Sequence, residues 1–532
     1  MPRWTTNSTC NLQMPQVEPL ARRLFWPFIL LGVVDRMVVL CVFAFRHVGI
    51  DDALIWEVCR DMGNGIFKEP FLYGQNYNPV LEALLGAPFV RLGGHPWVVL
   101  PLVTAFLAML PFWSFALWCR RSHAPFAALV LAAFPLVLPV EWTMITSMPR
   151  GFVHGLAILA FVPWIIRIRG TFLRSVLFGF VVATAAVINP NSLIAGLPTL
   201  IVWWRMERGS FKWIGGVLLG AIPAITWQWW ASHFFDERPW EAIHRLTPAE
   251  LAFDPGLIWL ALGYPSVFFR GLFPFYAEWG ALVLVVLIAL TVALWYRRER
   301  TYAFALVTVV VGTVIALGVI KVHDGCSSIF YPTSRMFLAL PLICAVSTAY
   351  LFRNAKLQSG TVIAIAVFAL LSVGWKAVLL PATIRHELAA QECAFVREEP
   401  ITVIKERCKR IAAAAERSNA ELIAPIRWPN LKVDHRAHFA AHLTCYACPS
   451  LLPAFPPSHG IGFDRRSWTK PKTDGTATVL FVGGDPFAWR ALDPSLVTDL
   501  SVESIQLHAM RCDLHSLDSL VLALGVDNDL GR

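Results

Sequence analysis

Long apolar runs separated by short polar segments occupy the first 381 residues. Because a helix needs about 20 mostly apolar residues to cross a bilayer, these runs predict an all-α polytopic membrane domain at 24–381. The sequence predicts eleven spans, at 24–45, 97–118, 124–140, 151–168, 172–189, 192–204, 211–231, 276–296, 301–320, 335–352 and 361–381. The run at 192–204 is short and follows Asn189-Pro190-Asn191, so one arm of a re-entrant hairpin is the alternative there.

Basic clusters between the spans predict the orientation. They lie at Arg22-Arg23, Arg120-Arg121, Arg167 to Arg174, Arg205 to Lys212, Arg297 to Arg300 and Arg353 to Lys356. All fall on one side when 192–204 crosses, and the positive-inside rule makes that side, with the tail 1–23, cytoplasmic. The opposite side then carries loops 46–96, 141–150, 232–275 and 321–334, and everything from 382 onward.

Residues 382–532 differ from the spans in pattern. Helical periodicity at about 383–396 and 401–419 is followed by strand-like runs at 421–426 and 477–484. This alternation predicts a separate extracytoplasmic α/β domain of about 150 residues, which is large enough to fold alone. Gly483-Gly484-Asp485 lacks the further glycines of a phosphate-binding loop and is interpreted as a strand-ending turn.

Composition agrees with the membrane interpretation. The chain is 56% hydrophobic and only 15% charged over 532 residues, which excludes an ordinary soluble protein. Its formal charge of +9 is scattered among small clusters. Because no continuous basic face results, the sequence does not indicate a nucleic-acid partner.

Most cysteines lie on the predicted outer side: Cys59, Cys326, Cys393, Cys408, Cys445, Cys448 and Cys512. An oxidising compartment permits disulfides there, although the pairing does not follow from spacing. Cys445-x-x-Cys448, near His435, His438 and His442, is alternatively half of a zinc site. No second Cys-x-x-Cys completes a four-ligand set at the usual spacing.

An acidic pair, Asp51-Asp52, follows the first span directly. Apolar residues then recur at helical spacing, which predicts a short amphipathic helix over 51–63 that lies on the membrane. One of the two aspartates suffices as the N-cap of this helix. The other is then available for chemistry, and Asp51 is the stronger candidate for a general base. Adjacent carboxylates also suit Mg²⁺ or Mn²⁺, with Glu57 and Asp61 as helpers.

The same outer loop continues with a polar and aromatic segment, Tyr73 to Pro79, and an apolar helix from Pro79 to about Leu92. Gln75 and Tyr77 combine an amide with an aromatic ring, as sugar-binding surfaces do. An interfacial aromatic belt is the alternative for the tyrosines. Glu82 either contributes to substrate binding or complements the helix dipole.

The order of these motifs resembles the GT-C superfamily of polyprenyl-phosphate-dependent glycosyltransferases. The resemblance rests on the acidic pair after the first span, on YGQxYxPxLEALLxAPF at 73–89 and on SRMFLALP at 334–341. It covers roughly 24–381 and points to the branch of protein mannosyltransferases, aminoarabinose transferases and rhizobial lipopolysaccharide glycosyltransferases. The chain departs from that pattern with Asp-Asp where many members have Asp-Glu, and with Met336 where tyrosine is usual.

The resemblance implies an acidic catalytic residue, matched by Asp51 or Asp52, and an arginine at the start of a late span, matched by Arg335. Transfer from a lipid-linked sugar phosphate independently requires a carboxylate for the acceptor and cations for the departing phosphate. The cationic candidates on the outer side are Arg335, Arg150, Lys321 and His323. Arg335 is the strongest, because a guanidinium can bind phosphate through two bonds; snorkelling to the membrane surface is its alternative role.

The sequence therefore predicts a glycosyltransferase of a bacterial inner membrane. Its donor would be a polyprenyl-phosphate sugar, and its acceptor an envelope lipid, glycan or protein on the outer face. A lipid or sugar transporter or flippase, and a non-catalytic scaffold, are the alternatives. Transporters commonly carry internal repeats, and none is evident here. Asp35 and Arg36 lie inside the first span, so each is expected to find a partner on another helix.

Overall fold

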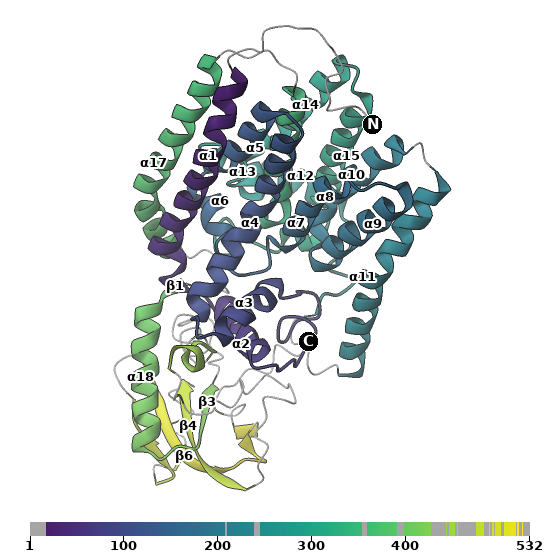
Figure 1. The fold of residues 1–532 in the computed structure, drawn as a ribbon. Helices are drawn as coiled ribbons and strands as arrows, with labels where there is room; N and C mark the ends of the chain where they lie inside the picture. The colour runs from purple at the N-terminus through teal and green to yellow at the C-terminus, as the bar shows by residue number, and fades with distance from the viewer. Residues whose placement is uncertain are drawn as a thin grey trace. The chain divides into compact units, whose positions relative to one another are not determined.

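The computed structural model is mostly helical and forms two compact units (Figure 1). The first unit comprises residues 1–44, 101–230 and 247–393, and the second comprises 45–100, 231–246 and 394–532. The structure describes residues 17–207, 210–238, 245–353, 359–390, 398–426, 443, 446–452, 455, 475–483, 489, 492–493, 495–501, 505–517, 519–520 and 524.

Helices lie over all eleven predicted spans. They are α1 (Val17–Val39) with the π-helix Leu40–Ala44, α4 (Pro96–Arg121), α5 (Pro125–Val137), α7 (His154–Ile158) with α8 (Val162–Ile165), α9 (Thr171–Ile188), α10 (Leu193–Met206), α11 (Phe211–Glu237), α14 (Leu282–Tyr296), α15 (Arg300–Ala316), α16 (Ala339–Leu351) and α17 (Ser359–Ala390). Shorter helices between them are α6 (Val140–Ile145), α12 (Pro255–Gly263) and α13 (Pro265–Phe269).

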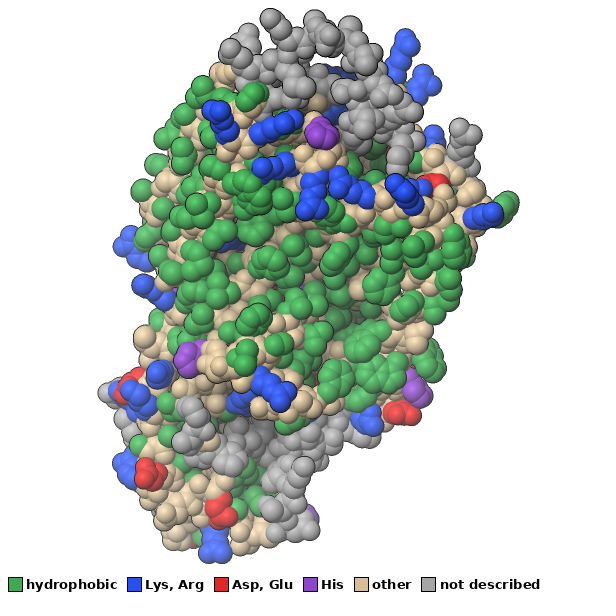
Figure 2. Space-filling view, viewed as in Figure 1, with side chains coloured by type: hydrophobic (Ala, Val, Ile, Leu, Met, Phe, Trp, Pro, Cys, Tyr) green, Lys and Arg blue, Asp and Glu red, His purple; other side chains and the backbone are tan. Residues whose placement is uncertain are grey.

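Six helical segments in the described part of the chain are long and apolar enough to cross a membrane by length and composition: Pro19–Ala44, Pro96–Arg121, Thr171–Ile188, Ala277–Tyr296, Thr333–Leu351 and Ser359–Ala390. Figure 2 shows hydrophobic side chains covering much of the helical face in view, with Lys and Arg gathered near its upper end. Such a belt bounded by cations is typical of a multi-pass membrane protein. The count of eleven crossings stays a prediction.

The two charges inside the first span have partners on other helices, as expected. Asp35 Oδ2 lies 2.7 Å from Lys376 Nζ of α17. Arg36 Nη1 donates to Thr146 Oγ1 at 2.7 Å and to the Thr143 carbonyl at 3.2 Å, and its guanidinium stacks 4.5 Å from the Trp142 ring centroid. Both contacts fix α1 within the bundle, because an unpaired buried charge is strongly unfavourable.

The second unit is built from two segments far apart in the sequence. Strand β1 (His47–Val48) pairs antiparallel with β2 (Glu399–Pro400), and helices α2 (Ile50–Gly63) and α3 (Leu81–Arg91) pack together. A four-stranded sheet has the order β3-β4-β6-β5, from β3 (Leu422–Ile426), β4 (Thr476–Gly483), β6 (Leu507–Asp513) and β5 (Val497–Asp499). The β3–β4 pair is parallel and the other two pairs are antiparallel.

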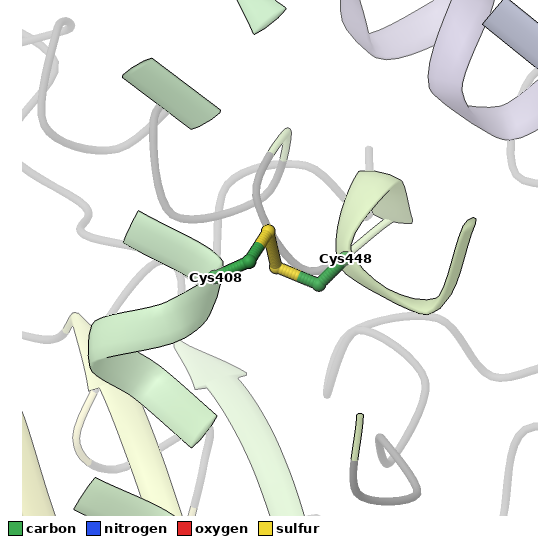
Figure 3. Close-up of a disulfide and its surroundings, with 2 residues drawn as sticks. All are labelled: Cys408 and Cys448. Carbon is green, nitrogen blue, oxygen red and sulfur yellow. A yellow bond between two sulfur atoms is a disulfide. The ribbon is translucent and has the colours of Figure 1, made fainter. Parts of the chain in front are cut away.

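One apolar core joins these two segments. Residues of α2 and α3, including Ile55 and Ala83, share a buried cluster with Ile404 of α18 (Ile401–Arg417) and with Leu451. A disulfide between Cys408 and Cys448 lies in the same cluster (Figure 3). The first outer loop therefore packs with the C-terminal segment instead of forming part of the helical unit.

Three sequence predictions need correction here. The helix over 51–63 exists as α2, but protein covers it on most sides, and even Asp61 is buried; it is not a helix resting on the membrane surface. The periodicity at 383–396 largely continues the last span, because α17 accommodates Pro381 and runs to Ala390. Cys448 is oxidised and cannot be a zinc ligand; Cys445 and the three nearby histidines lie outside the described residues.

Candidate functional site

The acidic pair occupies the first turn of α2. The helix starts after Gly49, whose backbone is extended with φ −103° and ψ 175°. The Gly49 N–H donates to Asp52 Oδ2 at 2.8 Å, and Asp52 is only 4% exposed. Gly49 is therefore the N-cap, so the prediction that one aspartate occupies that position is wrong in detail. Asp52 nevertheless satisfies the cap N–H from inside the helix, as in a capping box.

Asp51 lies in the same turn but is only half-buried. Its place near the helix N-terminus favours the ionised carboxylate, because the helix dipole stabilises an anion there. The two aspartates therefore differ in their surroundings: the Asp52 carboxylate accepts a hydrogen bond from the backbone, whereas part of the surface of Asp51 is accessible.

The acidic residues farther along α2 do not join this pair. Lys68 Nζ lies 2.7 Å from Asp61 Oδ2 and 3.9 Å from Glu57 Oε1. Tyr73 donates its hydroxyl proton to Asp61 at 2.9 Å. Burial and the neighbouring Asp61 raise the pKa of Tyr73. Glu57 and Asp61 therefore hold a lysine, and the described residues contain no group of three or more His, Cys, Asp or Glu placed to bind a metal ion.

The polar loop after α2 is held by hydrogen bonds between backbone N–H groups and side-chain oxygens. Gly74 N–H donates to Glu69 Oε2 at 2.8 Å, and Asn76 Oδ1 accepts from Leu246 N–H at 2.8 Å. Tyr73 is buried, so it belongs neither to an aromatic belt nor to an exposed sugar platform. Gln75 and Tyr77 are half-buried, and the buried Gln75 Oε1 has no hydrogen-bond partner among the described residues.

Glu82 lies in the first turn of α3 and is fully buried. A carboxylate at that position complements the helix dipole. Its burial places it beneath the loop surface, so direct contact with a substrate would require the loop to open. The dipole role is the one that the geometry favours.

Three of the four cationic candidates meet on one loop of the helical unit, residues 321–335. Arg335 Nη1 donates to the Pro332 carbonyl at 2.9 Å, and its Nη2 donates to the Asp324 carbonyl. Arg150 Nη1 donates to the Phe330 carbonyl. Lys321 Nζ lies 2.9 Å from Asp324 Oδ2. The sequence separation of Arg150 from this loop shows that the fold, and not local spacing, gathers these cations.

Arg335 is packed into the loop. Its side chain stacks 3.8 Å from the Tyr331 ring centroid, and the residue is 6% exposed. A Cβ on Gly325 would lie 2.6 Å from Arg335 Nη1, so glycine allows this close approach. Snorkelling requires a guanidinium that reaches water along an open path. The enclosed position of Arg335 does not fit that role.

Lys321 also binds Glu250 Oε1 at 2.9 Å, so it lies between two carboxylates. Burial opposes ionisation of Asp324, but Lys321 and then Arg335 outweigh it and lower the pKa of that carboxyl. His323 makes different contacts: its Nε2 lies 2.7 Å from the Leu317 carbonyl, and its ring packs edge-on to Phe268. His323 is therefore the one of the four candidates whose described side-chain contacts do not involve Asp324 or the backbone of residues 324–332.

Arg270 and Glu387, which the sequence did not identify as candidates, form an ion pair that also bonds to the backbone of this loop. Arg270 donates to the Ser327 carbonyl at 2.6 Å and lies 3.0 Å from Glu387 Oε1. Glu387 Oε2 accepts from Ile329 N–H at 3.1 Å. Burial would lower the pKa of Arg270, but Glu387 and Glu278 raise it. The predicted span ends at 381 and places Glu387 in the C-terminal domain, whereas α17 continues through Pro381 to Ala390. Helical periodicity that continues past Pro381 is the sequence signal that could have placed Glu387 on this helix.

Comparisons with known proteins give little. No protein-family model matches the chain, and no curated protein matches it. Among solved structures, the crystal structure of ArnT from Cupriavidus metallidurans bound to undecaprenyl phosphate is similar at 15% identity. The match covers 91% of this chain and 98% of that chain, with a TM-score of 0.45. Similarity at this level establishes neither a shared fold nor a shared activity.

Proposed function

We propose that this protein is an integral membrane glycosyltransferase that uses a polyprenyl-phosphate sugar as donor. The acceptor is an envelope lipid, glycan or protein on the outer face of a bacterial inner membrane. The observation that carries the proposal is the different surroundings of the two aspartates in the first turn of α2. Asp52 serves the Gly49 N–H, whereas Asp51 is partly accessible. A helix cap alone needs only one of them.

The proposed reaction is a displacement at the anomeric carbon. The Asp51 carboxylate accepts the proton of the acceptor hydroxyl or amine as a new bond forms to the sugar. The bond between the anomeric carbon and the phosphate oxygen breaks, and its electron pair leaves with the polyprenyl phosphate. Protonated Asp51 then returns its proton to solvent, so the step is balanced without a redox partner.

The loop 321–335, which we call the cationic loop, is proposed to bind the donor phosphate. Arg335 and Lys321 are held close to one another by contacts to Asp324. Because Lys321 lies between the Asp324 and Glu250 carboxylates, Arg335 is the cation proposed to stabilise the leaving group as it gains negative charge. Arg335 is only 6% exposed, so this contact requires the loop to open. Arg150 acts through the Phe330 carbonyl, so we assign it to positioning the loop, and we leave His323 out of the site.

The loop after α2 is proposed to contribute to sugar binding. Gln75 Oε1 is buried without a partner among the described residues, and an unsatisfied buried acceptor favours a ligand hydroxyl. Tyr77 offers an aromatic ring in the same half-buried segment. Glu82 supports α3 from within. The metal dependence is left to experiment, since Mg²⁺ or Mn²⁺ would need ligands beyond the acidic pair.

The deciding experiment uses purified protein in detergent with a synthetic undecaprenyl-phosphate sugar and an extract of envelope acceptors. Release of undecaprenyl phosphate, coupled to appearance of a glycosylated acceptor, is expected. Protein that carries the donor across liposome membranes without releasing the phosphate would instead identify a flippase. Repeating the assay with EDTA and with added Mg²⁺ or Mn²⁺ tests the metal separately.

The orientation needs its own test. A reporter that is active only outside the cytoplasm should be active when fused after Ala390 and silent when fused at Arg298. The reason is the alternation of basic loops. Activity at Arg298 would place the loop 321–335 in the cytoplasm and remove it from an outer-face reaction.

A further inference from the structure

The helical unit contains an apolar cavity that no residue of the cationic loop lines. Its volume is about 390 Å³, and its walls come from α4, α5, α8, α10, α14, α15 and α16. This volume falls within the roughly 300–1,000 Å³ typical of ligand pockets. Most lining side chains are aliphatic or aromatic, among them Trp118, Trp203 and Leu306. Such walls offer too few polar partners to hold ordered water, whereas a hydrocarbon chain matches them.

Two arginines mark one end of this cavity. Arg167 lines it directly, and Arg121 adjoins the lining residue Ser122. The guanidinium of Arg121 lies 4.9 Å from the Trp164 ring centroid, and that of Arg167 lies 5.9 Å from the same ring. Both arginines are exposed. In the part of the chain that the structure describes, neither forms an ion pair with a carboxylate.

Arg121 and Arg167 bring two positive charges to the Trp164 ring, and neither has a carboxylate partner among the described residues. This arrangement favours an anion bound between the two guanidinium groups. Other basic residues at this end do have acidic partners: Arg174 contacts Glu207 and Arg353 contacts Glu299. Arg120, Arg205 and Arg300 likewise contact aromatic rings and no carboxylate among the described residues. What distinguishes Arg121 and Arg167 is that they contact the same ring, that of Trp164, and that Arg167 lines the cavity. Guanidinium groups bind phosphate through parallel hydrogen bonds, so a phosphate is the anion that fits best.

The cavity is separate from the candidate site. Along α16 its lining residues run from Leu342 to Tyr350, whereas Arg335 precedes the helix. At 1.5 Å per residue along the axis, Arg335 lies roughly 10 Å from Leu342 and roughly 20 Å from Tyr350. Arg121 and Arg167 belong to clusters that the positive-inside rule places in the cytoplasm. The cavity therefore belongs to the predicted inner leaflet.

We propose that the cavity binds one acyl chain of an anionic phospholipid of the inner leaflet, with the phosphate between Arg121 and Arg167. The apolar walls match the chain, and the two exposed guanidiniums match the headgroup. Basic pockets between transmembrane helices on the cytoplasmic side bind anionic lipid headgroups in this way. The inference is independent of the proposed transferase reaction, since it uses none of that site's residues.

Native mass spectrometry of the purified full chain tests this, with phosphatidylglycerol and phosphatidylcholine of the same acyl composition as probes. The wild type should bind phosphatidylglycerol more tightly than phosphatidylcholine. The double variant Arg121→Gln/Arg167→Gln should bind phosphatidylglycerol roughly 10- to 100-fold more weakly, because charge-assisted hydrogen bonds are lost. Arg169→Gln is the matched control: this arginine is exposed in the same loop and does not line the cavity.

A second variant tests the acyl chain. Val346→Phe should fill part of the cavity and lower retention of both lipids, whereas Val367→Phe on the exposed face of α17 should not. Phosphatidylglycerol carrying a photoreactive group in its chain should label α4, α10 or α16. Equal binding of the two lipids, no effect of the double variant, or labelling confined to other helices would overturn the proposal. Preferential retention of undecaprenyl phosphate would also overturn it, by showing that the site selects a polyprenyl chain.

Discussion

The acidic pair and the cationic loop are held in place by different kinds of interaction. Asp51 and Asp52 sit on a helix whose position depends on an apolar core shared with α18 and on a disulfide. Arg335 and Lys321 sit on a loop held by backbone carbonyls and ion pairs. The first arrangement should therefore respond to changes in packing and redox state, and the second to changes in charge and pH.

Substituting Asp51 and Asp52 one at a time gives the largest expected difference in activity. Asp51→Asn should slow transfer by about 100- to 10,000-fold, the range of general-base catalysis. Asp52→Asn should keep most activity, since its amide oxygen can still accept from Gly49 N–H. Asp52→Ala should lose about 1 kcal/mol of stability, as a missing helix cap does. Turnover and thermal unfolding measured on all three variants decide the assignment; full activity in Asp51→Asn would refute it.

Removing the disulfide tests whether packing positions the acidic pair. Cys408→Ser/Cys448→Ser should destabilise the second unit by about 2–5 kcal/mol, as loss of a native disulfide does in small domains. Hydrogen exchange should then rise in α2 and α18 together, because they share one core. Cys512→Ser, at a cysteine that forms no disulfide, is the control. Faster exchange in α18 with α2 unchanged would show that the two helices are not coupled.

Arg335 tests the cationic loop. Arg335→Ala should weaken binding of undecaprenyl phosphate by roughly 10- to 100-fold, the loss expected for hydrogen bonds to a charged group. Arg335→Lys should lie between Ala and wild type, because an ammonium cannot form two parallel bonds. Arg385→Ala, at an exposed arginine of α17, serves as the control. Binding measured by titration, beside thermal unfolding, separates a lost phosphate contact from a collapsed loop.

Among the predicted changes in stability, acid should have the smallest effect, a loosening of the cationic loop. The pKa of Asp324 is lowered from its ordinary value of 3.8, so its ionisation stabilises the folded loop above about that pH. The stabilisation is lost as pH falls through the lower folded value. Proteolysis between 321 and 335 should accelerate below pH 3.8 in wild type, and Asp324→Asn should abolish this acid response. A response identical in both proteins would assign it to another carboxyl group.

Periodicity predicted the elements well, because it reports local burial. Apolar runs located the helices over all eleven ranges, and α18, β3 and β4 lie where the helical and strand-like patterns are. The same reasoning could not predict that α2 packs against residues after 400, since an apolar face does not reveal whether lipid or protein covers it. The predicted boundary at 381/382 stays a prediction, although the compact units divide the chain differently.

Only part of the candidate site could be predicted from the sequence. The acidic pair and Arg335 stood out because charge beside an apolar span is unusual. Arg270 and Glu387 did not, because their importance comes from backbone groups of a distant loop, Ser327 and Ile329, which the sequence does not relate to them. Likewise, the different surroundings of Asp51 and Asp52 follow from the position of Gly49 as the N-cap, which only the backbone geometry establishes.

The shared core of the second unit has a consequence for biosynthesis. Helix α2 ends at Gly63, yet its partners in α18 begin at Ile401, so more than three hundred residues must be made before its apolar contacts are complete. At about 5–20 residues per second, translation of that interval takes roughly 20–70 s. During this time α2 lacks those partners, so the apolar core of the second unit cannot be completed until the C-terminal segment emerges.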